Sequence, residues 1–280
     1  MTGVLTVHRQ FGSKVRVAER LLQLVPSDVA VWVEGFAGTA AMTLAKPPHP
    51  AEHLNDLNGD VVNLFEVLRD PESCARLCEL IHLTPYAQEE FERCRSEVWT
   101  TEPDDAPDPV ERARRFLVAS WQAIGGKQFT KANWRLDLGR SWLIGTWSRL
   151  PLRLQHAALR LKLCHIHRRH ITDMVGIFGR YSSALLFLDP PYPVDTRSTH
   201  ETMYAVEMGE AEHQALARQL RKVQARVLLT INPGTVYSDI LADWHVTPYA
   251  VRGLRNQVKN ELALSNYRPP ATLFSRGEAA

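Results

Sequence analysis

The 280-residue sequence lacks most of the features that mark specialised classes of protein. Its four cysteines are too few for a disulfide framework in so long a chain, so we expect a reduced, cytoplasmic protein. No apolar run approaches the roughly 20 residues of a membrane span, and the first ten residues have no signal-peptide core. Neither sign of charge dominates, because 33 basic and 31 acidic side chains leave a formal charge of +2. The composition indicates an ordinary globular protein and excludes membrane and fibrous classes.

Standard motifs for nucleotide phosphates and for zinc are also missing. There is no Gly-x-Gly-x-x-Gly, and no Gly-Lys-Ser/Thr follows the glycine turn at residues 35–38. Cys164-His165-x-His167-x-x-His170 permits a zinc interpretation, since alternate residues of a strand share one face. No Cys-x-x-Cys and no distant second ligand pair accompany it, so we expect no metal. Cys74 and Cys78, four residues apart, are predicted to be small apolar residues on one helix face.

Charge is segregated along the chain. Residues 51–110 contain 15 acidic and 4 basic side chains, whereas residues 111–170 contain 13 basic and 2 acidic ones. The basic block also contains four of the seven tryptophans, Trp121, Trp134, Trp142 and Trp147. Basic side chains neutralise phosphates, and aromatic rings stack on bases or pack a small core. The basic block is therefore either a nucleic-acid contact surface or a solvated face over a helical core. The tryptophans are expected in that core. The acidic block is expected to favour solubility.

The order of apolar segments indicates an α/β protein. Spacing of apolar residues predicts helices over 14–25, 61–68, 151–163 and 216–223. Short apolar runs predict strands at 29–33, around Leu54, at 185–188 and at 226–231. Alternating strands and helices are typical of a mostly parallel sheet covered on both faces. The proline-rich stretch 102–109 predicts a loop or a subdomain border.

Two predicted strand ends contain the residues suited to chemistry. The first strand runs into Glu34-Gly35-Phe36-Ala37-Gly38, and Asp56 follows the second strand about twenty residues later. Ligands of open α/β sheets bind at the carboxyl ends of strands, where an acid accepts hydrogen bonds from ribose hydroxyls. This arrangement favours a nucleoside ligand, although a glycine turn alone is also an ordinary strand-to-helix connection.

The other strand end is Asp189-Pro190-Pro191-Tyr192, directly after the apolar run 185–188. Two consecutive prolines fix the backbone and remove two donors. Asp189 and the Pro190 carbonyl would accept the two hydrogens of an exocyclic amine, and Tyr192 would stack on its ring. The turn therefore suits a planar heterocycle with an amine, and the alternative is a proline turn that ends a buried strand.

These motifs resemble S-adenosylmethionine-dependent DNA adenine methyltransferases of the Dam-like, D12 class. The resemblance rests on Phe36-Ala37-Gly38-Thr39-Ala40, Asn55-Asp56 and Asp189-Pro190-Pro191-Tyr192, together with Gln10-Phe11-Gly12-Ser13-Lys14, and covers nearly the whole chain. The sequence departs from the class at Ala40, where a second glycine is common, and at Ser13. Relatives often carry an acid for the cofactor's adenine before the catalytic strand, where this chain offers His170 or, three residues on, Asp173.

The resemblance implies a role for each matching residue. Asp189, Pro190, Pro191 and Tyr192 would be catalytic, and Tyr192 would stack on an adenine flipped out of the duplex. The residues implied to bind S-adenosylmethionine are Gln10, Lys14, Phe36, Gly38, Asp56 and Asp189. The segment between the two turns would read DNA, with Lys127, Lys131, Arg135 and Arg140 as candidate contacts.

The expected protein is thus a Rossmann-like methyltransferase sheet with an inserted, mostly helical target-recognition subdomain. Residues 1–66 and 161–280 would form the catalytic domain, and residues 67–160 the insertion. Its expected reaction is site-specific methylation of adenine N6 in double-stranded DNA by a monomer that contacts no membrane. The alternatives are methylation of cytosine N4 or of adenine in RNA, and a non-catalytic DNA-binding relative.

Overall fold

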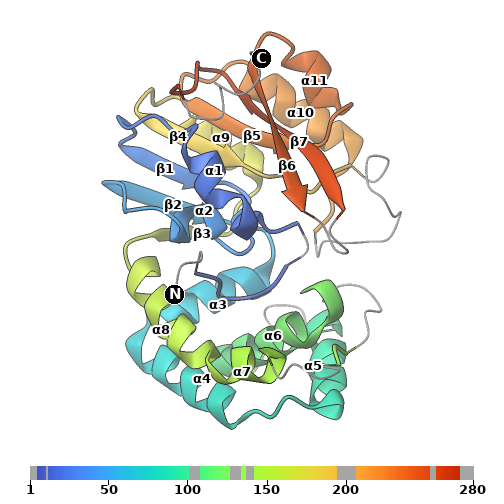
Figure 1. Ribbon diagram of the computed structural model, residues 1–280. Coiled ribbons are helices and arrows are strands. Elements are labelled where there is room, and N and C mark those ends of the chain that lie inside the picture. Colours follow the sequence, from blue (N-terminus) through green and yellow to red (C-terminus); the bar gives the residue numbers. More distant parts are fainter. Residues whose placement is uncertain are drawn as a thin grey trace.

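The structure is a computed structural model that describes residues 5–10, 12–100, 108–126, 134–136, 142–193, 206–252 and 257–271. It consists of a sheet half, with helices on both faces, and a helical half that packs against one end of it (Figure 1). The strands are β1 (Val31–Glu34), β2 (Ala51–Asn55), β3 (His165–His167), β4 (Ala184–Leu188), β5 (Arg226–Ile231), β6 (His245–Arg252) and β7 (Val258–Ser265). The helices of the sheet half are α1 (Ala18–Leu22), α2 (Ala41–Leu44), α9 (Ile171–Phe178), α10 (Glu210–Leu220) and α11 (Val236–Ile240).

The seven strands lie in the order β3-β2-β1-β4-β5-β7-β6. β1 pairs in parallel with β2 on one side and with β4 on the other, and β7 runs antiparallel to both of its neighbours, β5 and β6. The mostly parallel, methyltransferase-type sheet expected from the sequence is therefore confirmed. Strand order reverses beside β1, and in open sheets such a switch point leaves a crevice at the carboxyl ends.

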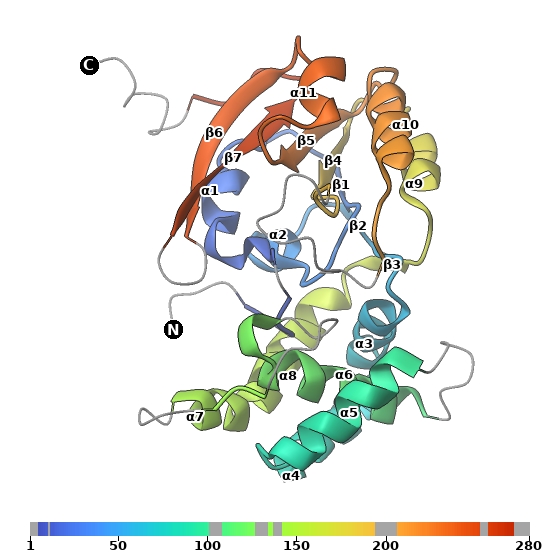
Figure 2. The ribbon, with the colours of Figure 1, turned by 90° about the vertical axis from the view of Figure 1, so that its right-hand side faces the viewer.

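Strand β4 shows why its sequence is apolar without interruption. Leu186 and Leu188 pack in the cluster under α9, α10 and α11, whereas Leu185 and Phe187 pack on the other face with α1 and α2. Figure 2 shows the sheet between α1 on the left and α9 and α10 on the right. A strand covered on both faces has no polar side, so its whole length is apolar.

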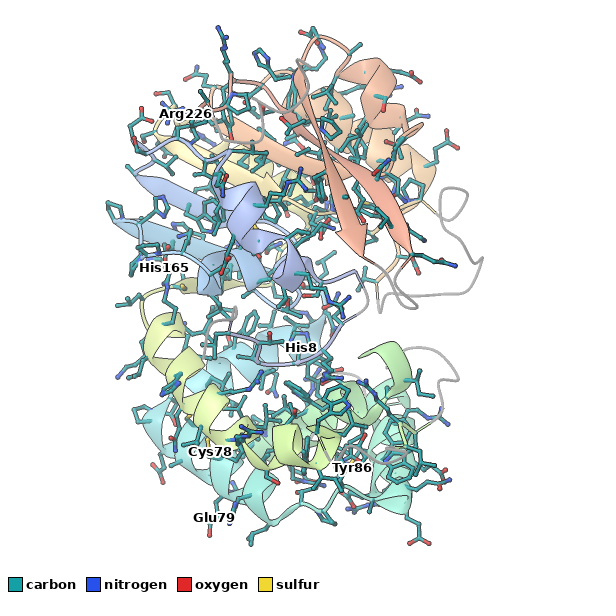
Figure 3. All side chains as sticks on the ribbon, in the orientation of Figure 1. His8, Cys78, Glu79, Tyr86, His165 and Arg226 are labelled. Atoms are coloured by element: carbon teal, nitrogen blue, oxygen red, sulfur yellow. The ribbon has the colours of Figure 1, made fainter. Side chains whose placement is uncertain are left out.

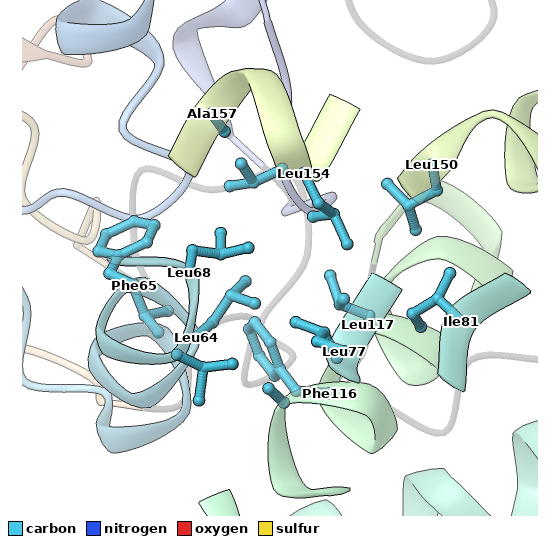
Figure 4. Close-up of a cluster of buried hydrophobic side chains, with 14 of the residues drawn as sticks. Leu64, Phe65, Leu68, Leu77, Ile81, Phe116, Leu117, Leu150, Leu154 and Ala157 are labelled. Carbon is cyan, nitrogen blue, oxygen red and sulfur yellow. The ribbon is translucent and has the colours of Figure 1, made fainter. Parts of the chain in front are cut away.

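The helical half contains α3 (Gly59–Arg69), α4 (Pro71–Leu83), α5 (Gln88–Thr100), α6 (Pro109–Gln122), α7 (Trp142–Ser148) and α8 (Leu150–Leu161). Asp70 and Asp108 cap α4 and α6 through their side chains, and a proline follows each cap. Both features are typical of helix starts. Apolar side chains from α3, α4, α6 and α8 form its core (Figure 4). Cys74 and Cys78 are buried in this core, as the sequence predicted.

Three expectations require correction. The helix expected over residues 14–25 is two short pieces, a 3-10 helix at Lys14–Arg16 and α1, because Val17 adopts a non-helical conformation between them. The tryptophans of the basic block were expected in the core, but Trp142 is 44% exposed. The acidic block does more than favour solubility, because Glu52, Asp60 and Glu90 form ion pairs with Arg160, Arg112 and Arg114 of the basic block.

The helical half is the connection between two neighbouring strands. β2 and β3 pair in parallel, and all six helices α3–α8 lie between them in the sequence. The bounds proposed for the insertion, residues 67 and 160, fall within α3 and α8. No helix in the described part of the chain has the length and apolar character needed to cross a membrane.

Candidate active site

A pocket opens at the carboxyl ends of β1, β2 and β4, where the switch in strand order predicts one. It holds about 1020 Å³ of space, part of which is open to solvent. Its walls come from the N-terminal segment, the turns after β1 and β2, the start of α9 and the turn after β4. Ligand sites of α/β proteins occur preferentially at such switch points of the sheet.

Glu34 ends β1 and fixes the turn that follows it. Its buried carboxylate accepts hydrogen bonds from the backbone N–H of Met42 at 3.4 Å and of Thr43 at 2.9 Å, and from the Thr43 hydroxyl at 2.5 Å. Burial raises the pKa of Glu34 to about 7, against the opposing effect of these donors. The carboxylate thereby ties the end of the strand to the first turn of α2.

The turn itself brings the backbone close to its neighbours. A Cβ on Gly35 would lie 2.5 Å from Leu188 Cδ2 and 2.7 Å from Ile171 Cδ1, so a larger residue would require these two side chains to shift. Gly38 and Ala40 have φ angles of 47° and 51°, in the left-handed region. Ala40 thus stands where a glycine would be unstrained, which gives a physical reason for the glycine that relatives of this sequence commonly have.

Asp56 lies directly beneath this turn. Its Oδ2 accepts from the backbone N–H of Gly38 at 2.7 Å, and its Oδ1 accepts from that of Asn58 at 2.9 Å. Burial raises the pKa of the carboxyl, and these N–H groups oppose the rise. Each carboxylate oxygen has a second lone pair, so Asp56 is able to accept from a pair of ligand hydroxyls in the pocket.

Asp189 faces the same pocket from the turn after β4. Its Oδ1 accepts from the Thr230 hydroxyl at 2.6 Å and forms an ion pair with Lys14 Nζ at 2.9 Å. Burial raises the pKa of Asp189, while Lys14 and Thr230 oppose this effect. Among the described residues, no hydrogen bond to Oδ2 is found, which leaves this oxygen to accept from an amine.

Lys14 links Asp189 to a second buried group of polar side chains. Its ammonium lies 3.3 Å from Glu261 Oε2 and donates to the Tyr192 hydroxyl at 2.9 Å. Burial alone would lower the pKa of Lys14, but the neighbouring carboxylates outweigh it and raise that pKa. Glu261 Oε2 also accepts from the hydroxyls of Tyr192, at 2.8 Å, and of Tyr249, at 2.6 Å. The charge and position of this lysine therefore hold the whole turn in place.

Comparison with known proteins identifies the family of this site. Residues 11–127 match the family model described as D12 class N6 adenine-specific DNA methyltransferase. This part of the chain belongs to that family. That family methylates N6 of adenine in DNA, with S-adenosylmethionine as the methyl donor. The resemblance seen in the sequence is confirmed.

Two solved structures of one protein, the rRNA methyltransferase aviRa from Streptomyces viridochromogenes, are similar to this methyltransferase. One is 14% identical in sequence, with a TM-score of 0.38, over 95% of this chain and 89% of the other. The second is also 14% identical, with a TM-score of 0.37, over 89% of this chain and 83% of the other. A comparison with curated protein sequences finds no match.

The pocket of the methyltransferase contains the groups that S-adenosylmethionine requires. A carboxylate, Asp56, is placed to receive ribose hydroxyls, the Phe36 ring offers an apolar surface, and the backbone of Gly38 approaches the open space without a side chain. All six residues predicted for the cofactor, Gln10, Lys14, Phe36, Gly38, Asp56 and Asp189, line this one pocket. The residues present therefore fit the cofactor, and their individual roles remain predictions.

The other predicted residues are placed less uniformly. Pro191 lines the pocket with Asp189, whereas Pro190 and Tyr192 are not among its lining residues. Tyr192 is connected to the pocket by its hydrogen bond with Lys14, which is a lining residue. His170 lines the pocket and caps α9, but exposed Asp173 does not line it. The candidate DNA contacts Lys127, Lys131 and Arg140 lie outside the described residues. Arg135 lies in the short described segment 134–136.

The residues of the zinc-like sequence do not converge. Cys164 is buried, and its thiol contacts Glu52, whereas the His165 ring stacks on His53 and His167 Nε2 lies 3.0 Å from His53 Nδ1. Throughout the described ranges, no group of three His, Cys, Asp or Glu side chains is arranged to hold a metal ion.

Sequence reasoning missed three side chains that hold the catalytic turn. Thr230, in β5, donates a hydrogen bond to Asp189. Tyr249 and Glu261 lie in the antiparallel strands β6 and β7. Glu261 had a visible signal, because it is an acid directly before the apolar run Leu262-Ala263-Leu264 of a strand. Its partners Lys14 and Tyr192 are 247 and 69 residues away, which the sequence does not reveal.

Proposed function

We propose that the pocket beside Asp56 holds S-adenosylmethionine and that Asp189 receives the N6 amine of a target adenine flipped out of duplex DNA. The observation that carries this proposal is the position of Asp189: one carboxylate oxygen is fixed by Thr230 and Lys14, and the residue lines the pocket that Asp56 also lines. When bound, the cofactor supplies an electrophilic methyl group. Asp189 Oδ2 and the Pro190 carbonyl would accept the amine hydrogens and orient the nitrogen lone pair toward that methyl group.

Orientation and exclusion of water account for catalysis in this proposal. Lys14, Thr230 and Glu261 fix Asp189 and Tyr192 before substrate arrives, so no reorganisation is needed during the reaction. Tyr192 would stack on the extruded base in place of its lost neighbours. Its hydroxyl is held between Lys14 and Glu261, which limits the positions that the ring adopts.

The test uses tritiated S-adenosylmethionine with unmethylated duplex DNA, followed by analysis of the labelled nucleosides. Wild-type protein is expected to label N6-methyl-2′-deoxyadenosine from DNA, and Asp189→Ala is expected to lower the rate by at least about 100-fold, as for loss of one preorganised acceptor. Asp239→Asn is a matched control, because Asp239 is an exposed carboxylate on α11 that does not line the pocket. Label in N4-methylcytosine or in RNA would favour the alternatives, and full activity of folded Asp189→Ala would refute the mechanism.

We also propose that the enzyme acts as a monomer in the cytoplasm and recognises a specific DNA site. The four cysteines are buried free thiols, which supports a reducing compartment. The helical half, with residues 67–160 as its proposed extent, would read DNA, and its position across the N-terminal segment from the sheet supports this role (Figure 1).

A further inference from the structure

Three arginines from distant parts of the sequence meet around two tryptophans. The guanidinium of Arg9 lies over the rings of Trp121, at 4.7 Å, and Trp142, at 5.7 Å. Arg135 lies 4.5 Å from the centre of the Trp142 ring, and Arg153 lies 5.9 Å from that of Trp121. Cations and indoles thus alternate in an arginine–tryptophan ladder, which we define as these five side chains.

The charges of this ladder are not neutralised. Within the described part of the chain, no carboxylate forms an ion pair with Arg9, Arg135 or Arg153, and no acceptor binds their guanidinium groups. Other arginines of the helical half behave differently, since Arg112 and Arg114 pair with acids. Among the residues that the structure describes, the ladder therefore keeps three positive charges together without a counter-charge.

Such an arrangement costs free energy unless an anion binds. Burial, together with the charges of Arg135 and Arg153, lowers the pKa of Arg9 to about 10. Ring faces hold a guanidinium through attraction of the cation to the π system, worth about 0.5–2 kcal/mol each. A ring contacts the flat face of the guanidinium, so the N–H donors in the guanidinium plane remain available for hydrogen bonds. These donors match the oxygens of a phosphate.

The ladder adjoins the active site through the N-terminal segment. Arg9 directly precedes Gln10, which lines the cofactor pocket. The preceding residues are anchored in the helical half, where the Val7 carbonyl accepts from Trp121 Nε1 at 3.1 Å and His8 is buried against Phe116. Figure 3 shows His8 between the sheet and the helices, so this segment lies where both halves meet.

We infer that Arg9, Arg135 and Arg153 form a binding site for backbone phosphates of the DNA strand that carries the target adenine. Arg135 was a candidate DNA contact from the sequence, whereas Arg9 and Arg153 were not. The inference rests on the proposed function, because a phosphate bound beside Gln10 would set the strand next to the pocket that receives the base. Half-exposed Trp142 serves here to hold two of the guanidinium groups rather than to fill the core.

The test measures binding of a fluorescent 25-base-pair duplex by anisotropy between about 50 and 300 mM salt. R9Q, R135Q and R153Q are each expected to reduce the salt slope by about 0.9, the value for loss of one phosphate contact. R153K should retain most of the slope, because it keeps the charge. R218Q is the matched control: it removes the same charge from an exposed position on α10 in the sheet half.

Two further measurements separate this inference from the proposed function. Binding of S-adenosylmethionine, followed by calorimetry, is expected to be unchanged in R153Q. Unchanged salt slopes in all three variants would overturn the inference, and lower melting temperatures at unchanged slopes would assign the ladder a structural role only. Neither result would affect the proposed function, which fails if the wild-type protein does not methylate N6 of adenine in DNA.

Discussion

Replacement of Lys14 by methionine should reveal how strongly this one cation stabilises the active site. Lys14 is 5% exposed and lies 2.9 Å from Asp189 Oδ1 and 3.3 Å from Glu261 Oε2. Lys14→Met would leave two carboxylates facing each other in a buried site. Removal of one partner of a buried ion pair typically costs about 3–5 kcal/mol, so we expect a loss of this size in the free energy of unfolding.

The assay is urea unfolding of four proteins: wild type, Lys14→Met, Glu261→Gln and the double variant. Because Glu261→Gln removes one of the two repelling charges, the double variant should be more stable than the sum of the single effects predicts, by at least about 1 kcal/mol. Without Lys14, the pKa of Asp189 should rise further, because burial already raises it.

The pH dependence supplies an independent check with a definite sign. A carboxyl whose pKa is raised in the folded state binds more protons there, so the variant should gain stability relative to wild type as pH falls. The deficit of Lys14→Met should thus be smaller at pH 5 than at pH 8. A deficit below about 1 kcal/mol, or one that is equal at both pH values, would refute this account of the site.

Three further predictions concern the cofactor pocket. Asp56→Ala should weaken S-adenosylmethionine binding at least tenfold in calorimetry, because a hydrogen bond to a charged group is worth about 1.5–3 kcal/mol; unchanged affinity would remove Asp56 from the site. Because the pKa of Glu34 is raised to about 7 in the folded protein, wild type should lose about 3 kcal/mol of stability as the pH rises from 4.5 to 7, and Glu34→Gln should not. Urea unfolding measures this difference, and parallel pH profiles of the two proteins would contradict it. Gly35→Ala should lower stability by about 1–3 kcal/mol, since its Cβ would overlap Leu188 and Ile171, and an unchanged melting temperature would show that this contact yields freely.

The predictable part of the site lies in segments where chemistry and local structure coincide in the sequence. Asp56 and Asp189 each follow an apolar strand, and parallel strands bring their carboxyl ends to one edge of the sheet. The same reasoning predicted the central strands, because a strand buried on both faces has an uninterrupted apolar sequence.

The rest depends on contacts between remote segments, which local patterns do not encode. The antiparallel strands β6 and β7 alternate in polarity only in part, and their Tyr249 and Glu261 acquire a role only where the hairpin packs beside β5. The charge blocks along the chain likewise did not reveal which arginines have ion-pair partners in space. Arg112 is neutralised by Asp60 in space, 52 residues away, whereas Arg153 in the same block has no such partner among the described residues.

The connection between β2 and β3 has a consequence for how such enzymes diversify. Parallel neighbours always need a crossover of a dozen or more residues, and one helix is enough to provide it. Here six helices, α3 to α8, occupy this obligatory link, so lengthening or exchanging them leaves strand order and hydrogen-bond register untouched. New recognition surfaces can therefore arise in the link while the edge of the sheet that bears Asp56 and Asp189 stays as it is.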